Sequence, residues 1–271
     1  MAQRRLRGEP IAYILGYKDF YGLGFKVDKN VLIPRPETEM VVDLVTAKLR
    51  SLPSCQGGVP SEARRGGWSN VDSGANPSVP INRDTFPWQG RRLRGIPIKI
   101  LDLGTGSGCI IISLAKLMGT IWRPPDGAHQ GNRRIEFYAS DISSAALKIA
   151  RQNAQKHHVK IKFTQSDLLK NIKQDFGIII ANLPYLAPGW KSAELKFEPK
   201  QALFAKEKGL MIIRKLLEQI AALKHQPRLV YLEFDPRQKP QLLSLIKKSL
   251  PGSIVKFYKD YNNFWRYVEI K

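Results

Sequence analysis

From residue 98 to its end, the chain alternates between short apolar runs and longer amphipathic segments. The short runs are rich in β-branched residues and leucine and have the length of strands, whereas the longer segments carry apolar residues at helical spacing. Strands are expected at 98–103, 136–140, 160–164, 176–182, 229–234, 253–258 and 264–270, and helices at 109–118, 144–157, 210–223 and 240–250. Strands that alternate with helices pair in parallel, with helices on both faces of the sheet. The alternation therefore predicts an α/β domain over residues 98–271.

The last two predicted strands break this alternation, because only the polar turn 259–263 separates them. A connection this short joins antiparallel strands, whereas parallel strands need a longer crossover. The hairpin is therefore expected at one edge of the sheet. A mostly parallel, Rossmann-like sheet with an antiparallel hairpin at its C-terminal edge resembles the class I methyltransferase fold.

The N-terminal part of the chain has a different texture. Aromatic residues and glycines in the segment 13–25 indicate a β-hairpin, and Pro36 opens a predicted helix that has glutamates in its first turn. We interpret residues 1–50 as this hairpin and a lead-in helix. Residues 51–97 are dominated by Gly, Pro, Ser, Asn and Arg without periodicity, which is typical of a disordered insertion. A second polar insertion spans 122–134.

The chain is strongly basic, with a formal net charge of +21 and a pI of about 10.0. This charge favours association with RNA or the ribosome, although a generally basic proteome explains it equally well. No apolar stretch is long enough to span a membrane, and the basic start, residues 1–7, lacks the apolar core of a signal peptide. Cys55 and Cys109 lie in unlike contexts, and no histidine has metal-ligand spacing with them. We therefore expect a reduced, cytoplasmic monomer without a metal site or a membrane contact.

A glycine-rich loop follows the first strand of the α/β domain, in the sequence Leu101-Asp102-Leu103-Gly104-Thr105-Gly106-Ser107-Gly108-Cys109. Glycines between a strand and a helix let the backbone approach a ligand closely and leave free N–H groups at the helix start. The Gly-x-Gly-x-Gly spacing differs from the Gly-x-Gly-x-x-Gly of nicotinamide-binding proteins. Asp102 precedes the loop where methyltransferases that resemble this chain orient the loop and the amino group of the cofactor. We interpret residues 104–108 as an S-adenosylmethionine-binding loop, with a dinucleotide site as the alternative.

Carboxylates follow the next two predicted strands. Asp141 ends its strand and is placed to accept two hydrogen bonds from ribose hydroxyls. Its alternative role is to cap the helix that starts near Ser144. Asp167 and Leu168 follow the third strand, where similar enzymes hold the adenine amino group, and an ordinary turn is the alternative. We assign Asp141, Asp167 and Leu168 to the cofactor site, together with Asn182 at the end of the fourth strand.

The segment Ala181-Asn182-Leu183-Pro184-Tyr185 carries the predicted chemistry. An amide or exocyclic amine nitrogen is a poor nucleophile because its lone pair is delocalised, so an enzyme must orient the planar NH₂ group. The side-chain oxygen of Asn182 and the carbonyl of Leu183 can each accept one N–H, and Tyr185 can pack on the planar group. Asn182, Pro184 and Tyr185 are therefore candidate catalytic residues. An ordinary proline turn is the alternative.

Further motifs extend along almost the whole chain outside the two insertions. They are the stretches 8–16, 20–22, 25–27, 31–39 (Val-Leu-Ile-Pro-Arg-Pro-Glu-Thr-Glu), 103–108 and 232–233, together with Asp141 and the Asn-x-Pro-Tyr segment. These motifs resemble those of the release factor glutamine methyltransferases. The resemblance implies methylation of the glutamine in the Gly-Gly-Gln motif of a peptide chain release factor, which would be the protein partner. It also implies that residues 182–185 hold the substrate together with Arg35, Pro36 and Glu37, and that the stretch 35–39 forms a wall of the site.

The chain departs from the pattern of that family in three ways. Position 183 is leucine, whereas the family usually has Asn-Pro-Pro-Tyr. Because the acceptor at Leu183 is a backbone carbonyl and Pro184 already holds this residue extended, we expect the geometry to be kept. We also expect the helical N-terminal domain of the family to be missing before the hairpin. The third departure is the unusual length of the insertion 51–97.

Two other functions stay open at this point. The segment Asn-Leu-Pro-Tyr also resembles ribosomal RNA adenine dimethyltransferases, so an adenine-N6 methyltransferase acting on RNA or DNA is the first alternative. The positive charge supports it. A non-catalytic nucleic-acid-binding module on a methyltransferase fold is the second alternative.

Deletion of residues 52–94, with a short Gly/Ser bridge, tests the interpretation of the long insertion. We predict that the remaining chain still folds, because the segment has too few apolar residues for a core and loop length changes stability slowly. Thermal unfolding of the shortened chain is the measurement. A lost cooperative transition, or a Tm lower by more than about ten degrees, would show that the segment packs on the domain.

Overall fold

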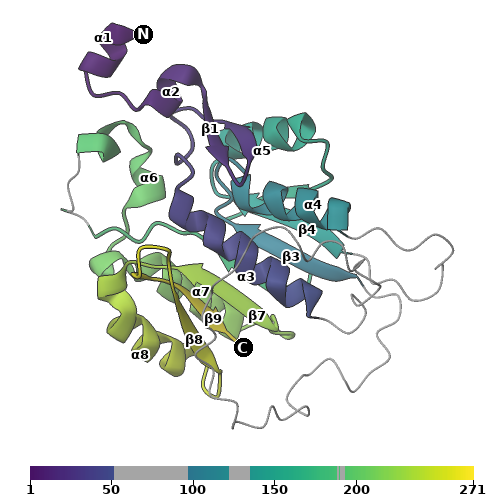
Figure 1. The fold of residues 1–271 in the computed structure, drawn as a ribbon. Coiled ribbons are helices and arrows are strands. Elements are labelled where there is room, and N and C mark those ends of the chain that lie inside the picture. The colour runs from purple at the N-terminus through teal and green to yellow at the C-terminus, as the bar shows by residue number, and fades with distance from the viewer. Residues whose placement is uncertain (52–96, 122–134, 188, 190–192) are drawn as a thin grey trace, which may run out of the picture.

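The computed structural model describes residues 1–51, 97–121, 135–187, 189 and 193–271. Its centre is a seven-stranded sheet in the order β5-β4-β3-β6-β7-β9-β8 (Figure 1). The strands are β3 (Ile98–Leu103), β4 (Ile135–Asp141), β5 (Lys162–Gln165), β6 (Ile178–Ala181), β7 (Leu229–Glu233), β8 (Val255–Lys259) and β9 (Trp265–Ile270). Strands β3 to β7 pair in parallel, and β9 runs antiparallel to both β7 and β8. The predicted mostly parallel sheet with an antiparallel hairpin at its C-terminal edge is confirmed.

The direction of strand addition reverses in the middle of this sheet. From β3 the chain moves outward through β4 to β5, then returns to β6 on the other side of β3 and continues to β7. As a result β3 and β6 are neighbours, with Leu101 beside Ile179 and Leu103 beside Ala181. Such a reversal leaves a crevice at the carboxyl ends of the two strands, where ligands of open α/β sheets bind.

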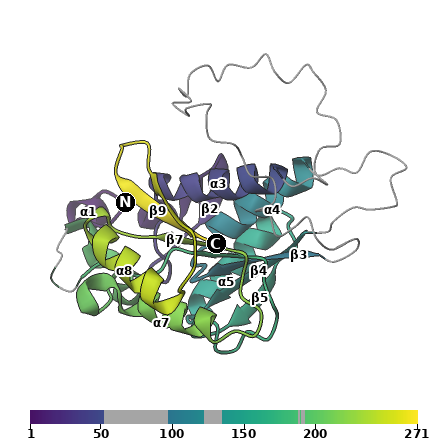
Figure 2. The same cartoon turned by 90° about the horizontal axis from the view of Figure 1, so that it is seen from below.

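Alternate side chains along each strand enter two separate cores. On β3, Ile98 and Ile100 face the first core, whereas Leu101 and Leu103 face the second. The main helices are α3 (Glu39–Arg50), α4 (Cys109–Ile121), α5 (Ser144–Lys156), α7 (Met211–Ala221) and α8 (Lys239–Ser249). Helices α3 and α4 pack in the first core and α7 and α8 in the second, on opposite sides of the sheet (Figure 2). This double coverage explains why every residue of β6 is both apolar and buried.

The N-terminal part is joined to the sheet domain by buried contacts. It contains α1 (Ala2–Leu6), α2 (Ile11–Leu15), the strands β1 (Tyr17–Phe20) and β2 (Leu23–Lys26), and the short 3₁₀ helix η1 (Pro36–Thr38), which leads into α3. Strands β1 and β2 form the predicted antiparallel hairpin. The Asn153 side chain on α5 accepts a hydrogen bond from the N–H of Lys26 at 2.8 Å and donates to the carbonyls of Lys26 and Ser107 at 3.0 and 2.8 Å. One buried amide thus connects the hairpin, α5 and the glycine loop.

Some short helical segments have no counterpart in the sequence prediction. They include α1, α2, η5 (Ala193–Phe197) and α6 (Lys200–Leu203). Each has at most five residues, so none is long enough to show a recurring apolar pattern, and helices of this length depend on tertiary contacts. The predicted longer elements are all present, with ends that differ by a few residues.

Parts of the sequence interpretation fall outside the described residues. These are the second insertion, 122–134, and nearly all of the first, 51–97, including Cys55. In the part that is described, Cys109 is a buried free cysteine. No helix in these ranges is long and apolar enough to cross a membrane. The described side chains also contain no group of three His, Cys, Asp or Glu residues that could hold a metal ion.

Gly108, at the start of α4, offers a test of how tightly α4 and α5 pack. It has a φ of +83°, and a Cβ atom would lie 2.8 Å from Ile112 Cδ1 and 3.3 Å from Ala150 Cβ. Gly252 has the same φ of +83° with nothing within 4 Å of the added atom. We predict that Gly252→Ala costs only backbone strain, about 1–2 kcal/mol. Gly108→Ala should cost about 1–3 kcal/mol more because of crowding.

Urea unfolding of the two variants measures the difference directly. Because the backbone strain is matched, the Gly252→Ala variant is the control for it. Equal losses of unfolding free energy in both variants would show that the contact between α4 and α5 is not tight at this position.

Candidate active site

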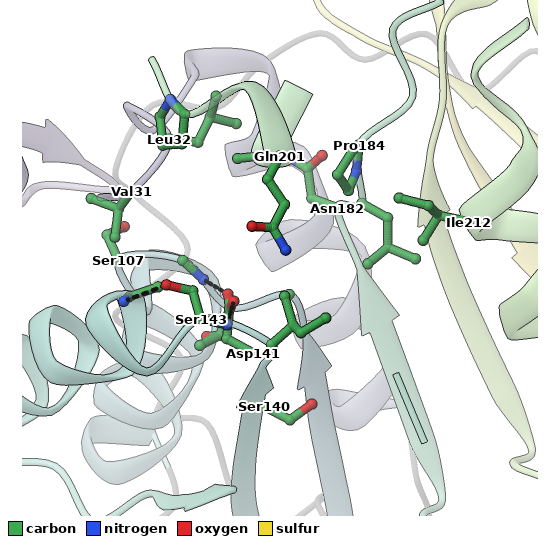
Figure 3. Close-up of a pocket in the computed structure, with 18 of the residues that line it drawn as sticks. Val31, Leu32, Ser107, Ser140, Asp141, Ser143, Asn182, Pro184, Gln201 and Ile212 are labelled. Atoms are coloured by element: carbon green, nitrogen blue, oxygen red, sulfur yellow. Dashed lines mark hydrogen bonds between the residues drawn. The ribbon is translucent and has the colours of Figure 1, made fainter. Parts of the chain in front are cut away.

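An open cavity of about 380 Å³ lies where β3 and β6 end (Figure 3). The glycine loop after β3 and the segment after β6 form two of its walls, as the reversal of strand order requires. Eleven of the predicted site residues line it: Arg35, Gly104, Thr105, Gly106, Ser107, Asp141, Asp167, Leu168, Asn182, Leu183 and Pro184. The remaining four, Pro36, Glu37, Gly108 and Tyr185, do not line it. The tertiary structure thus gathers most of the predicted residues around one cavity.

The glycine loop is fixed at both sides by acidic residues. Gly104, Gly106 and Gly108 all have positive φ, which explains the glycine at these positions. Asp102 lies beneath the loop, 1% exposed, and accepts a 2.6 Å hydrogen bond from the Thr105 hydroxyl. At Gly104 an added Cβ would come within 3.1 Å of Leu183 Cδ2. The loop therefore approaches the segment after β6 closely.

The second acid, Asp141, holds the other side of the loop. Its Oδ2 accepts the N–H of Gly106 at 2.9 Å, and its Oδ1 accepts the N–H of Ser143 at 2.9 Å (Figure 3). Ser143, and not Asp141, caps α5, because its hydroxyl accepts the N–H of Ala146 at 3.1 Å. Burial raises the pKa of Asp141, although these backbone hydrogen bonds oppose the shift. Each carboxylate oxygen has capacity for a further hydrogen bond, so Asp141 can also accept hydroxyl groups from the cavity.

Asp167 and Leu168, which follow β5, line the cavity. Asp167 makes an ion pair with Lys215 of α7, and both residues line the cavity. Leu168 is buried and has a φ of +52°, an uncommon backbone conformation for leucine. This turn is tied to α7 a second time, since the N–H of Leu169 donates to Gln219 Oε1 at 2.8 Å.

The side chain of Asn182 belongs to a network of hydrogen bonds that reaches beneath the cavity. Asn182 Nδ2 donates to Thr38 Oγ1 at 3.3 Å, and Thr38 Oγ1 donates to Glu233 Oε2 at 2.9 Å. The hydroxyl of Tyr185 donates to Glu233 Oε1 at 3.0 Å, and that of Tyr267 donates to Glu233 Oε2. Tyr185, whose ring we expect to pack on a planar substrate group, directs its hydroxyl toward this buried carboxylate.

Glu233, at the end of β7, is the centre of this network. It is 1% exposed, and burial raises its pKa despite the hydrogen bonds from Tyr267 and Thr38 and the charge of Arg266. Arg266 itself pairs with Asp260 at 3.0 Å. A buried carboxylate is costly unless its oxygens are satisfied, and three hydroxyl donors from different parts of the chain satisfy this one.

The backbone after Asn182 is held by Gln238, which is 4% exposed. Its Nε2 donates to the carbonyls of Tyr185 and Lys208 at 2.7 and 2.8 Å. Gly209, beside Lys208, has a φ of +90°, and a Cβ there would lie 1.9 Å from the oxygen of Tyr185. The backbone at the end of residues 182–185 is therefore held in place by the Gln238 hydrogen bond and by close contact with the turn that precedes α7.

Arg35 borders the cavity on the side of the N-terminal part. It pairs with Glu198, a 4% exposed carboxylate that also accepts the N–H of Ile33 at 3.2 Å. Pro36 is exposed and Glu37 is half-buried, and both lie off the cavity. Of the predicted wall 35–39, Arg35 and Thr38 line the cavity.

Several residues at the site had no sequence prediction as site residues. They are Glu198, Gln201, Lys215, Glu233 and Gln238. Gln201, on α6, extends into the cavity (Figure 3). Glu233 lies inside the motif 232–233, so the resemblance could have identified it. The others follow no periodicity, and only their contacts reveal them.

The cavity offers two different chemical environments. One side presents backbone N–H groups of a glycine loop and the carboxylates of Asp141 and Asp167, which suit a polar ligand with hydroxyl and amino groups. The other side presents the amide of Asn182 and the segment with Leu183 and Pro184. A ligand held on the first side therefore lies next to any planar group held on the second.

The chain shows similarity to methyltransferases along its whole length. The model of a methyltransferase domain family matches residues 97–242. The release factor glutamine methyltransferase of Lactococcus lactis is 30% identical over 100% of this chain and 80% of its own length. The bifunctional methyltransferase of Rickettsia felis is 34% identical over 99% of this chain, which spans 46% of that longer protein.

Solved structures are similar at the level of the fold. A methyltransferase from Pyrococcus furiosus superposes with a TM-score of 0.53 at 16% identity, covering 100% of this chain and 98% of that one. At this identity the likeness concerns the fold, and it agrees with the mixed sheet described above.

The buried Asp102 should make the stability of the protein depend on pH. Burial raises its pKa from 3.8 to about 7, although Thr105 opposes the shift. Asp102 therefore binds a proton more tightly in the folded state than in the unfolded state. The stabilisation that this proton gives the folded state is complete below pH 4 and is lost as the pH rises to 7. The loss is on the order of 4 kcal/mol. We predict that Asp102→Asn flattens the fall in unfolding free energy between pH 4 and 8.

Urea unfolding across this pH range is the measurement, and Asp235→Asn is the control. Burial opposes ionisation of Asp235, but hydrogen bonds from Arg237 outweigh it and lower the pKa. The contribution of Asp235 to the unfolding free energy changes only below pH 4. Replacing Asp235 should therefore leave the pH dependence of the unfolding free energy between pH 4 and 8 unchanged. An unchanged slope in Asp102→Asn would contradict the assignment.

Proposed function

The chain belongs to the release factor glutamine methyltransferase family, and on this premise we propose that it methylates a glutamine side chain in a peptide chain release factor. The methyl donor would be S-adenosylmethionine, and the acceptor would be the amide nitrogen of the glutamine in a Gly-Gly-Gln motif. The observation that carries the proposal is the position of Asn182. Its amide and the glycine loop line the same cavity, at the ends of two neighbouring parallel strands.

The first side of the cavity fits S-adenosylmethionine. Gly106 has nothing within 4 Å of the Cβ position, so the loop leaves room for a ligand against its backbone. We assign the methionine part to residues 104–108, the ribose to Asp141, and the adenine to Asp167 and Leu168. When bound, the cofactor supplies a methyl group that its sulfonium centre makes electrophilic.

The second side would hold the acceptor amide. One N–H of the glutamine donates to Asn182 Oδ1 and the other to the carbonyl of Leu183, which turns the nitrogen lone pair toward the methyl group. The bond from nitrogen to the methyl carbon forms as the bond from sulfur to that carbon breaks. The methylated nitrogen then releases a proton to water. Because the cationic amide is strongly acidic, no side chain has to act as a general base.

The lining of the cavity favours a glutamine over an adenine. Enzymes that act on an extruded base hold it by stacking, commonly on aromatic side chains. Among the described residues that line this cavity, none is aromatic. Its two described basic side chains, Arg35 and Lys215, make ion pairs with Glu198 and Asp167. Their positive charges are therefore already balanced and do not favour binding of a phosphate group. A slender amide side chain matches these walls better than a nucleotide does.

Methyl transfer from radiolabelled S-adenosylmethionine tests the proposal. The substrates are a release factor with its Gly-Gly-Gln motif intact, the same factor with that glutamine changed to alanine, and ribosomal RNA. We predict label in the first alone. Asn182→Ala should lower turnover on the order of a hundredfold, because it misorients the nucleophile, while cofactor affinity stays within a few fold.

Asp141→Ala is the matched control, since it alters the cofactor side of the same cavity. Its affinity for S-adenosylmethionine, measured by calorimetry, should fall. Label in RNA and none in the intact release factor would transfer the assignment to an adenine methyltransferase. Label in neither substrate would leave the binding-module alternative.

A further inference from the structure

We propose that Thr38 is a positioning residue that sets which way the side-chain amide of Asn182 faces. The inference rests on the proposed function, because it concerns the residue that would hold the acceptor nitrogen. Thr38 lies at the end of η1, at the N-terminus of α3, and is 2% exposed. It lines the same cavity as Asn182, although 144 residues separate the two in the chain.

The direction of the hydrogen bonds follows from Glu233. Thr38 has a single hydroxyl proton, and its Oγ1 donates this proton to Glu233 Oε2 at 2.9 Å. Thr38 Oγ1 then has only lone pairs to offer Asn182. The group of Asn182 that faces Thr38 must therefore be the NH₂, as found at 3.3 Å.

The consequence lies on the other side of the amide. With Nδ2 committed to Thr38, Asn182 Oδ1 points away from it, and within the described part of the chain this oxygen accepts no hydrogen bond. An acceptor oxygen is what the N–H of a substrate amide requires. The reversed amide would present NH₂ to NH₂, so that two donors would meet. Fixing the orientation thus selects the state of Asn182 that can bind the nucleophile.

Tyr267 allows Thr38 to be separated from the network as a whole. The hydroxyls of Thr38 and Tyr267 both donate to Glu233 Oε2. Only Thr38 also contacts Asn182. A role that consisted merely of satisfying Glu233 would make the two hydroxyls equivalent, whereas a role in orienting Asn182 makes Thr38 different.

The experiment measures kcat and KM for methyl transfer in Thr38→Val, Thr38→Ser and Tyr267→Phe. Valine has the shape of threonine without the hydroxyl, so we expect kcat to fall about ten- to a hundredfold with KM for S-adenosylmethionine within a few fold. Serine, which keeps the hydroxyl, should restore most of the rate. Tyr267→Phe should lower kcat much less. The Tm of each variant is measured, and Thr38→Ala replaces valine if valine disturbs packing.

The double variant Thr38→Val/Asn182→Ala gives the decisive comparison. If Thr38 acts through Asn182, the double variant turns over at the rate of Asn182→Ala alone, because there is no amide left to orient. Losses that multiply, or equal losses in Thr38→Val and Tyr267→Phe, would overturn the inference. The wild-type substrate assay tests the proposed function separately, because the variants are compared on whichever substrate the wild-type chain methylates.

Discussion

The carboxylate of Glu233 is buried at the end of a central strand, and the arrangement of the site depends on satisfying it. Removing an ionised carboxylate from water costs several kcal/mol unless hydrogen bonds replace the lost solvent. Here the donors come from three separate segments: Thr38 before α3, Tyr185 after β6 and Tyr267 on β9. Each segment must therefore keep its place for the carboxylate to stay buried. The N-terminal part, the acceptor segment and the C-terminal hairpin are held together at one point.

The same contacts place the walls of the cavity. Helix α3 packs in the same core as α4 through Val41, Val42 and Val45, which positions Thr38 at the carboxyl ends of the strands. Arg35, three residues earlier, lines the cavity and makes an ion pair with Glu198. The N-terminal part thus contributes to the site through buried side chains and not merely as a connection. The predicted boundary at residue 50 separates two stretches of the sequence, but the residues on its two sides share one hydrophobic core.

Three buried acids near the site lower the stability of the folded protein. Burial raises the pKa values of Asp102, Asp141 and Glu233, so each of the three favours the protonated form more than it would in water. One oxygen of Asp102 has no hydrogen-bond partner among the described residues. Such groups lower the stability of the empty protein at neutral pH and are typical of functional sites, where they hold loops and ligands in place.

The sequence by itself determined the strands and the main helices, and it predicted which residues would gather at the site. The alternation after residue 98 predicted a parallel sheet, because hydrophobic periodicity is a local signal. The glycine loop, Asp141 and Asn182 were placed at strand ends because each directly follows an apolar run. Only the tertiary structure decided the roles of Tyr185, Glu198 and Gln238. Their partners lie far away in the chain, as with Ile33 and Glu198, 165 residues apart. No local pattern encodes such contacts, since they arise only when the sheet brings its loops to one edge.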